Sequence, residues 1–111
     1  MKKAITIATL AVVTTFSLVA AAGQWTSSWG TITKLESYGD DTHIAGLDLS
    51  DNPGNCSDIT WGKVDYTASP EKKEGLARIL TAAFLAGRQV KVKMYNTCQN
   101  GSPKIYGVQV Q

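Results

Sequence analysis

The chain has 111 residues, of which 43% are hydrophobic and 18% charged, and its formal net charge is +2. This length predicts one small domain with a thin core, and the sequence contains no internal repeat or low-complexity tract. The weak net charge, without a basic run rich in aromatic residues, argues against nucleic acid as a ligand.

Residues 1–22 predict a secretory signal peptide. Lys2 and Lys3 precede an uncharged apolar run over residues 4–20, and an Ala-x-Ala site favours cleavage near Ala22. The run is long enough for a membrane helix, but no charged stop follows it, so we expect no membrane span after cleavage. The mature protein is then secreted or periplasmic. Two of the eleven basic residues lie in this segment, so nine remain against nine acidic ones.

Residues 23–29 predict an N-terminal arm in front of a single domain over residues 30–111. The arm carries Trp25 and Trp29 beside threonine and serine. Flat aromatic rings beside polar groups suit sugars, so both indoles are candidate ligand-binding groups. The alternative is an arm folded over the domain or over a neighbouring subunit, because large aromatic side chains mostly contribute by burial.

Three strands are expected in the first half of the domain. Residues 31–38 and 43–49 are rich in strand-forming residues and flank a Gly-Asp-Asp turn, which predicts a hairpin. Residues 50–57 then predict a loop. Residues 59–66 predict a third strand, in which Trp61 is expected to lie in the core.

One amphipathic helix is expected over residues 70–86. Ser69 suits the N-cap, Pro70 suits the first helical position, and Gly87 suits the left-handed residue that ends a helix. Apolar residues at spacings of three and four predict one buried stripe. These residues are Leu76, Ile79, Leu80, Ala83 and Phe84.

Two strands are expected after the helix, separated by a loop over residues 96–103. Apolar residues alternate with lysine and tyrosine over residues 90–95, which predicts a half-buried strand. Its outward residues form either a solvated face or an edge that meets another subunit; they are Lys91, Lys93 and Tyr95. The last strand, residues 105–110, is expected to place Tyr106, Val108 and Val110 on one side.

Three strands, a helix and two strands are the element order of the OB-fold, so we expect a mainly β domain with one helix, built as a five-stranded barrel. Two cysteines in an exported chain usually pair, which predicts a disulfide between Cys56 and Cys98. The two loops that carry them lie at the same end of such a barrel. The second of these loops is a common binding region of the fold. The leading candidate ligand-binding residues around it are Tyr95, Asn96, Gln99, Asn100 and Ser102.

Residues 79–101, ILTAAFLAGRQVKVKMYNTCQNG, resemble the helix, glycine, strand and Cys-x-Asn-Gly sequence of the receptor-binding B subunit of Shiga-type toxins. The layout also resembles other B subunits of bacterial AB toxins and a group of small uncharacterised exported bacterial proteins. This resemblance implies a ring of five OB-folds that binds cell-surface glycans. One difference concerns the disulfide, because the partner cysteine of the Shiga-type subunit lies near the mature N-terminus, whereas Cys56 follows the second strand.

The acidic residues and the single histidine, His43, predict neither a metal site nor an enzyme. Aspartates suit turns, no second histidine or free thiol completes a zinc site, and the EF-hand pattern is absent. No serine or cysteine nucleophile lies in a recognisable motif to pair with His43. We therefore expect no catalytic residue, no metal and no cofactor.

Two functions from different classes follow from the sequence. The first is an exported, disulfide-bonded binding module, oligomeric by resemblance, that recognises a glycan or similar surface ligand. The second is a periplasmic or secreted structural or inhibitor protein that binds another protein through its basic helix and strand surface.

Overall fold

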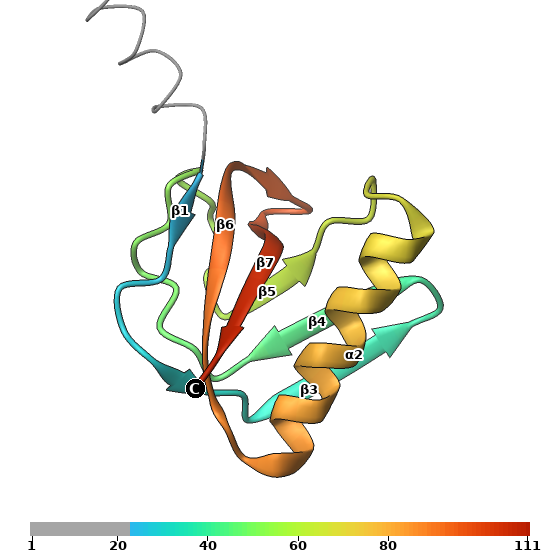
Figure 1. The fold of residues 1–111 in the computed structure, drawn as a ribbon. Helices are drawn as coiled ribbons and strands as arrows, with labels where there is room; N and C mark the ends of the chain where they lie inside the picture. The colour runs from blue at the N-terminus through green and yellow to red at the C-terminus, as the bar shows by residue number, and fades with distance from the viewer. Residues whose placement is uncertain (1–22) are drawn as a thin grey trace, which may run out of the picture.

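A computed structural model describes residues 23–111 as a mainly β domain with one helix, as the sequence predicts (Figure 1). The predicted signal peptide lies outside the described residues. The strands are β1 (Gln24–Trp25), β2 (Gly30–Thr31), β3 (Lys34–Tyr38), β4 (Asp41–Ala45), β5 (Trp61–Val64), β6 (Gln89–Gln99) and β7 (Ser102–Val110), and the helix is α2 (Pro70–Ala86).

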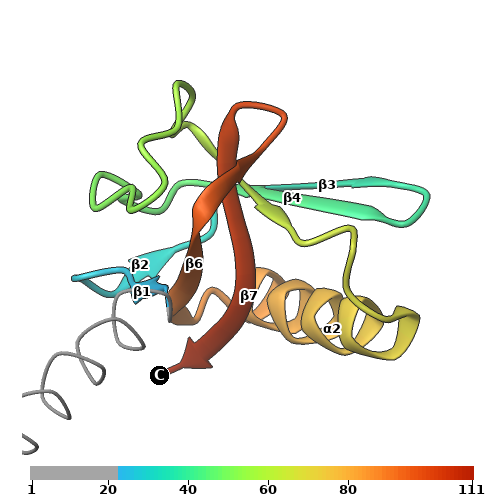
Figure 2. The same cartoon turned by 90° about the horizontal axis from the view of Figure 1, so that it is seen from above.

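The strands form one mixed sheet in the order β1-β6-β7-β5-β4-β3, and β2 also pairs with β6. Every pair is antiparallel except β5 with β7, which is parallel. The sheet is not closed. It contains seven strands in place of the expected five because the segment before β4 is divided into three short strands. In Figures 1 and 2, α2 runs alongside the β3–β4 hairpin.

The two ends of α2 are those that the sequence predicts. The Ser69 side chain accepts a hydrogen bond of 3.4 Å from the amide of Lys72, and Pro70 occupies the first turn. Gly87 has a φ of 65° and ends the helix, because this left-handed conformation costs glycine nothing. The predicted stripe is wrong at Ile79, which is 47% exposed. The buried residues of the helix are Leu80 and Ala83.

The core lies between α2 and the inner face of the sheet. Its buried residues come from β4, β5, α2, β6, β7 and the adjoining loops, and Val90, Val92 and Met94 of β6 face it as predicted. Trp61 does not join them, contrary to the prediction. It is half-buried because the pleat of β5 directs Gly62 and Val64 inward and places Trp61 with Lys63 on the other face.

The long β6–β7 hairpin replaces the loop predicted over residues 96–103. Asn100 and Gly101, with φ values of 49° and 80°, make the whole turn, and Gln99 pairs with Ser102 across it. Two residues with positive φ suit a hairpin turn whose twist matches that of the strands, so both strands continue to the turn.

A β-bulge changes the face to which the residues of β7 point. Lys93 pairs with Gly107, whereas the next residue, Met94, pairs with Ile105, so Tyr106 is the extra residue. Ile105, opposite the buried Met94, is therefore fully buried, while Tyr106 leaves the face that Val108 occupies. The simple alternation predicted for this strand fails at the bulge.

The predicted disulfide between Cys56 and Cys98 is confirmed, with the two Cα atoms 5.7 Å apart. The bridge joins the loop before β5 to the distal part of β6. That loop is also held by Asn52, whose carboxamide donates to the carbonyl of Cys56 at 2.9 Å and accepts from its amide at 2.8 Å.

Candidate functional site

The candidate site is built on β6, because this strand presents a different chemistry on each side. Its inner residues are buried in the core, which fixes the strand in place. Its outer residues, Lys91, Lys93 and Tyr95, are half-buried, so each stem is supported while its polar end reaches solvent. The strand therefore holds two ammonium groups and a phenol in a row along one face.

The N-terminal arm lies along β6 and adds two indoles to this face. The Thr26 amide donates to the carbonyl of Val92 at 2.9 Å, and the Val92 amide donates to the Thr26 hydroxyl at 3.1 Å. Ser27 continues the attachment, since its amide and hydroxyl both donate to the carboxylate of Asp51. Because Thr26 is buried, its neighbour Trp25 points to the outer side of β6.

Each lysine of this region lies over an aromatic ring. The Nζ of Lys91 is 5.2 Å from the ring centroid of Trp29, and the Nζ of Lys93 is 5.7 Å from that of Trp25 and 5.6 Å from that of Tyr106. The Nζ of Lys104 lies 5.7 Å from the ring centroid of Tyr95. We call this set the aromatic–lysine face; it consists of Trp25, Trp29, Lys91, Lys93, Tyr95, Lys104 and Tyr106.

The centre of the face is a stacked pair of tyrosines. The rings of Tyr95 and Tyr106 have centroids 3.9 Å apart and planes inclined by 21°. The bulge at Tyr106 makes this contact, because it turns that side chain outward beside β6 while Ile105 enters the core. Stacked rings of this kind are worth about 0.5–1.5 kcal/mol beyond their burial, so the contact favours this arrangement of the two tyrosines.

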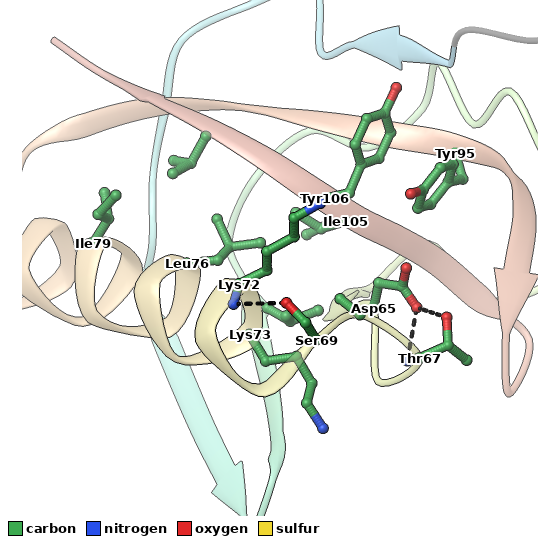
Figure 3. A pocket seen from close by; sticks show the side chains of 13 residues that line it. Asp65, Thr67, Ser69, Lys72, Lys73, Leu76, Ile79, Tyr95, Ile105 and Tyr106 are labelled. Carbon is green, nitrogen blue, oxygen red and sulfur yellow. Dashed lines mark hydrogen bonds between the residues drawn. The ribbon is translucent and has the colours of Figure 1, made fainter.

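A cleft of about 540 Å³ opens at the tyrosine pair, between α2 and β7. Leu76, Ile79 and Val108 line its apolar part. In Figure 3, Lys72 extends from α2 toward β7, whereas Lys73 extends away from it. The cleft thus joins the aromatic–lysine face to an apolar floor.

Asp65 lies at the tyrosine end of this cleft. Its carboxylate accepts hydrogen bonds from the amide of Thr67 at 2.9 Å and from its hydroxyl at 2.6 Å. The Tyr95 hydroxyl points toward Asp65 in Figure 3. Burial raises the pKa of Tyr95, and the charges of Asp65 and Tyr106 raise it further, so this phenol remains a neutral hydrogen-bonding group.

Only some of the residues predicted around the last hairpin join this site. Tyr95 lies at its centre, and Trp25 and Trp29 come to it through the arm. Gln99 is buried, and its carboxamide accepts from the amide of Tyr66 and donates to the carbonyl of Val64, so its side chain holds β5 in place.

The other predicted hairpin residues lie apart from the aromatic–lysine face. Ser102 is fully buried, and its hydroxyl has no hydrogen-bond partner within the described residues. Asn96 is exposed on β6 beyond Tyr95, and Asn100 is exposed in the turn. Neither asparagine lines the cleft.

The sequence predicts Lys91 and Lys93 only as part of a solvated face or a subunit edge. The sequence does not predict that these lysines lie above the rings, because nothing local to the arm shows that the arm pairs with β6. The alternation of lysine and tyrosine on β6 was the available signal.

His43 lies on another part of the sheet, beside Glu36 and the ring of Tyr38. Its Nδ1 is 3.9 Å from the Glu36 carboxylate, and its ring centroid is 5.4 Å from that of Tyr38. Burial lowers the pKa of His43, and Lys63 lowers it further against the opposite effects of Asp41 and Glu36. Over residues 23–111, no three metal-ligating side chains come together.

Neither the protein-family models nor the curated proteins compared with this chain match it. Within the described part of the chain, no helix has the length and apolar character needed to cross a membrane.

Proposed function

We propose that this protein is an exported, disulfide-bonded binding module that recognises a glycan through the aromatic–lysine face. The observation that carries the proposal is the clustering of four aromatic rings with three lysines on one side of the β6–β7 hairpin. Sugars combine apolar ring faces with hydroxyl groups. Aromatic side chains with polar neighbours match both properties.

The rings are accessible enough to serve this purpose. Trp29 is 37% exposed, and Trp25, Tyr95 and Tyr106 are half-buried. The half-buried rings are already partly ordered by their neighbours, so little conformational entropy is lost when a ligand covers their exposed parts. The cleft beside Tyr95 extends the surface and supplies an apolar floor for the end of a longer ligand.

The toxin B-subunit resemblance adds an oligomeric state to the proposal. By that resemblance the module forms a ring, a pentamer, of OB-like barrels and is secreted or periplasmic. The support for an OB-like arrangement is that β2 pairs with β6 while β3, two residues later, pairs with β4.

A second function is favoured by a different surface. Leu85 of α2 is 78% exposed and does not line the cleft, which suits contact with another protein. An exported inhibitor or structural protein would use this helix and not the aromatic–lysine face. Substitution on each surface therefore separates the two functions.

The test is binding of the purified mature protein to a glycan array, followed by calorimetry with any glycan retained. We expect Trp25→Ala and Tyr106→Ala each to weaken binding by at least tenfold. The matched control is Tyr38→Ala, which removes a 59% exposed tyrosine far from the face and is expected to leave binding unchanged. Light scattering under native conditions measures the oligomer.

The outcome against the proposal is specific. A folded monomer that retains no glycan of any class would refute it. A stoichiometric protein partner from the same compartment, released by Leu85→Glu and indifferent to free sugars, would establish the second function in its place.

A further inference from the structure

We infer that the glycan is acidic, with carboxylate or sulfate groups that bind Lys91 and Lys93 while its sugar rings lie on the neighbouring aromatic residues. This inference rests on the proposed function and adds the chemical class of the ligand.

The first step is the charge of the hairpin that carries the face. Residues 88–111 contain four basic residues and no acidic one. The mature chain has as many acidic as basic residues, so the positive charge of this segment is balanced by acidic residues elsewhere in the molecule. A local field of one sign concentrates ligands of the opposite sign.

The second step is that these lysines lack carboxylate partners. Over residues 23–111, the ion pairs within 4.0 Å are Glu36 with His43 and Glu74 with Arg78, and neither involves the face. The ammonium groups of Lys91 and Lys93 instead lie more than 5 Å above indole rings. Such contacts at exposed sites are worth about 0.5–1 kcal/mol, so a ligand anion can draw each ammonium away from its ring at little cost.

The third step concerns the kind of hydrogen bond that lysine makes. An ammonium group has three donors and no acceptor, and its bonds to charged oxygens are about twice as strong as those between neutral groups. A neutral sugar therefore uses little of the hydrogen-bonding capacity of an ammonium group. A carboxylate or sulfate uses it fully.

The position of the anion follows from Asp65. This buried carboxylate lies at the tyrosine end of the cleft and would repel an acidic group placed beside it, whereas Lys72 and Lys73 line the cleft on the side of α2. Lys91 and Lys93 lie along β6 on the other side of the tyrosine pair and are separated by one residue, about 7 Å along a strand. Acidic groups on neighbouring units of a chain fit this spacing, while an uncharged part of the ligand lies beside Asp65.

Nucleic acid is the other polymer that combines anions with flat rings, and the structure favours it less. Affinity for nucleic acid comes mainly from neutralising many phosphates. The first half of the mature chain, residues 24–65, carries seven acidic residues against two lysines, which opposes a long polyanion outside the face. We therefore propose a short acidic glycan, with single-stranded DNA as a competing outcome of the test.

The experiment compares four probes of similar length by calorimetry: oligogalacturonate, a heparin-derived oligosaccharide, a neutral cello-oligosaccharide and oligo-dT. We expect the acidic sugars to bind at least tenfold more tightly than the neutral one. Their affinity should fall as sodium chloride rises from about 0.05 to 0.5 M, because salt screens exposed charges. The first two probes distinguish carboxylate from sulfate.

Lysine variants locate the effect. Lys91→Gln and Lys93→Gln should each weaken acidic-sugar binding about two- to fivefold, the range of an exposed ion pair, and should weaken it more than they weaken binding of the neutral sugar. The control is Lys34→Gln, an exposed lysine on β3 outside the face, which should change neither. Circular dichroism verifies that each variant is folded.

The outcomes separate this inference from the proposed function. Equal, salt-independent binding of neutral and acidic sugars overturns the inference and preserves glycan binding. Preference for oligo-dT overturns both, and so does the absence of binding to every sugar by a folded protein. Loss of acidic-sugar binding in Lys34→Gln as large as in Lys93→Gln would also overturn it.

Discussion

Removal of the Cys56–Cys98 disulfide is expected to lower the stability of the fold strongly. The bridge spans a sequence separation of 42 residues. In the chain-entropy model, a closed loop of that size removes enough freedom from the unfolded chain to stabilise the fold by about 4 kcal/mol. Small domains have total stabilities of only about 5–15 kcal/mol, so the loss is a large share of the whole.

The contacts around the disulfide determine which segments become more mobile when it is removed. The loop between β4 and β5 contains no strand, and the Asp58 amide donates to the carbonyl of Gly101 at 2.9 Å beside the bridge. Asp51 of the same loop holds Ser27 of the arm. Without the disulfide we expect this loop and the arm to exchange their amide hydrogens faster than the core strands do.

Urea denaturation of the mature protein and of Cys56→Ser/Cys98→Ser measures the effect. We expect the double variant to lose about 3–5 kcal/mol, and the single variant Cys56→Ser to expose one reactive thiol at Cys98. Equal stability of the parent and the double variant would refute the reasoning. So would a parent, exported under oxidising conditions, in which both thiols react with a thiol reagent.

Three further predictions concern the core, the pH dependence and the face. Leu80→Ala should lower the free energy of unfolding, measured in urea, by about 2–5 kcal/mol because Leu80 is fully buried. Leu85→Ala, at a 78% exposed position, should change it by less than about 0.5 kcal/mol, and similar losses for the two variants would mean that the helix is oriented differently. Burial lowers the pKa of His43 in the folded state, so the unfolded chain takes up the proton first, and stability should be full above pH 6.5 and fall as the pH drops below it. His43→Gln should lose this dependence, and an unchanged slope of stability against pH would contradict the prediction. A Cβ at Gly107 would lie 3.2 Å from the Cβ of Lys93 and 3.5 Å from the Trp25 indole. Gly107→Val should therefore shift the NMR resonance of the Trp25 indole N–H and weaken glycan binding without unfolding the protein. An unchanged resonance would contradict this packing.

The features that the sequence predicts well are those with a local physical cause. The helix over Pro70–Ala86 has a capping serine, a proline at its start and a glycine at its end, and each acts within a few residues. The inward face of β6 follows from strict alternation. The disulfide follows from the cysteine count and the predicted export, because two cysteines leave one intramolecular pairing.

The features that the sequence does not predict depend on partners distant in the chain. Trp61 has the composition of a core residue, but its pairing opposite Ala45 and the pleat of β5 decide which side it faces. The bulge at Tyr106 depends on the register of β6 against β7, and no residue in β7 alone marks it. The arm pairs with β6 although more than 60 residues separate them in the sequence.

The aromatic–lysine face is a product of these nonlocal features acting together. If β7 alternated without its bulge, Tyr106 and Ile105 would exchange sides, and the face would lose one ring of its stacked pair while the core would gain a phenol. If the arm did not bond to Val92, the two indoles would have no support beside the lysines. The core requires Ile105 to be inside and the site requires Tyr106 to be outside, so a single extra residue satisfies both conditions and links the stability of the fold to the presence of the site.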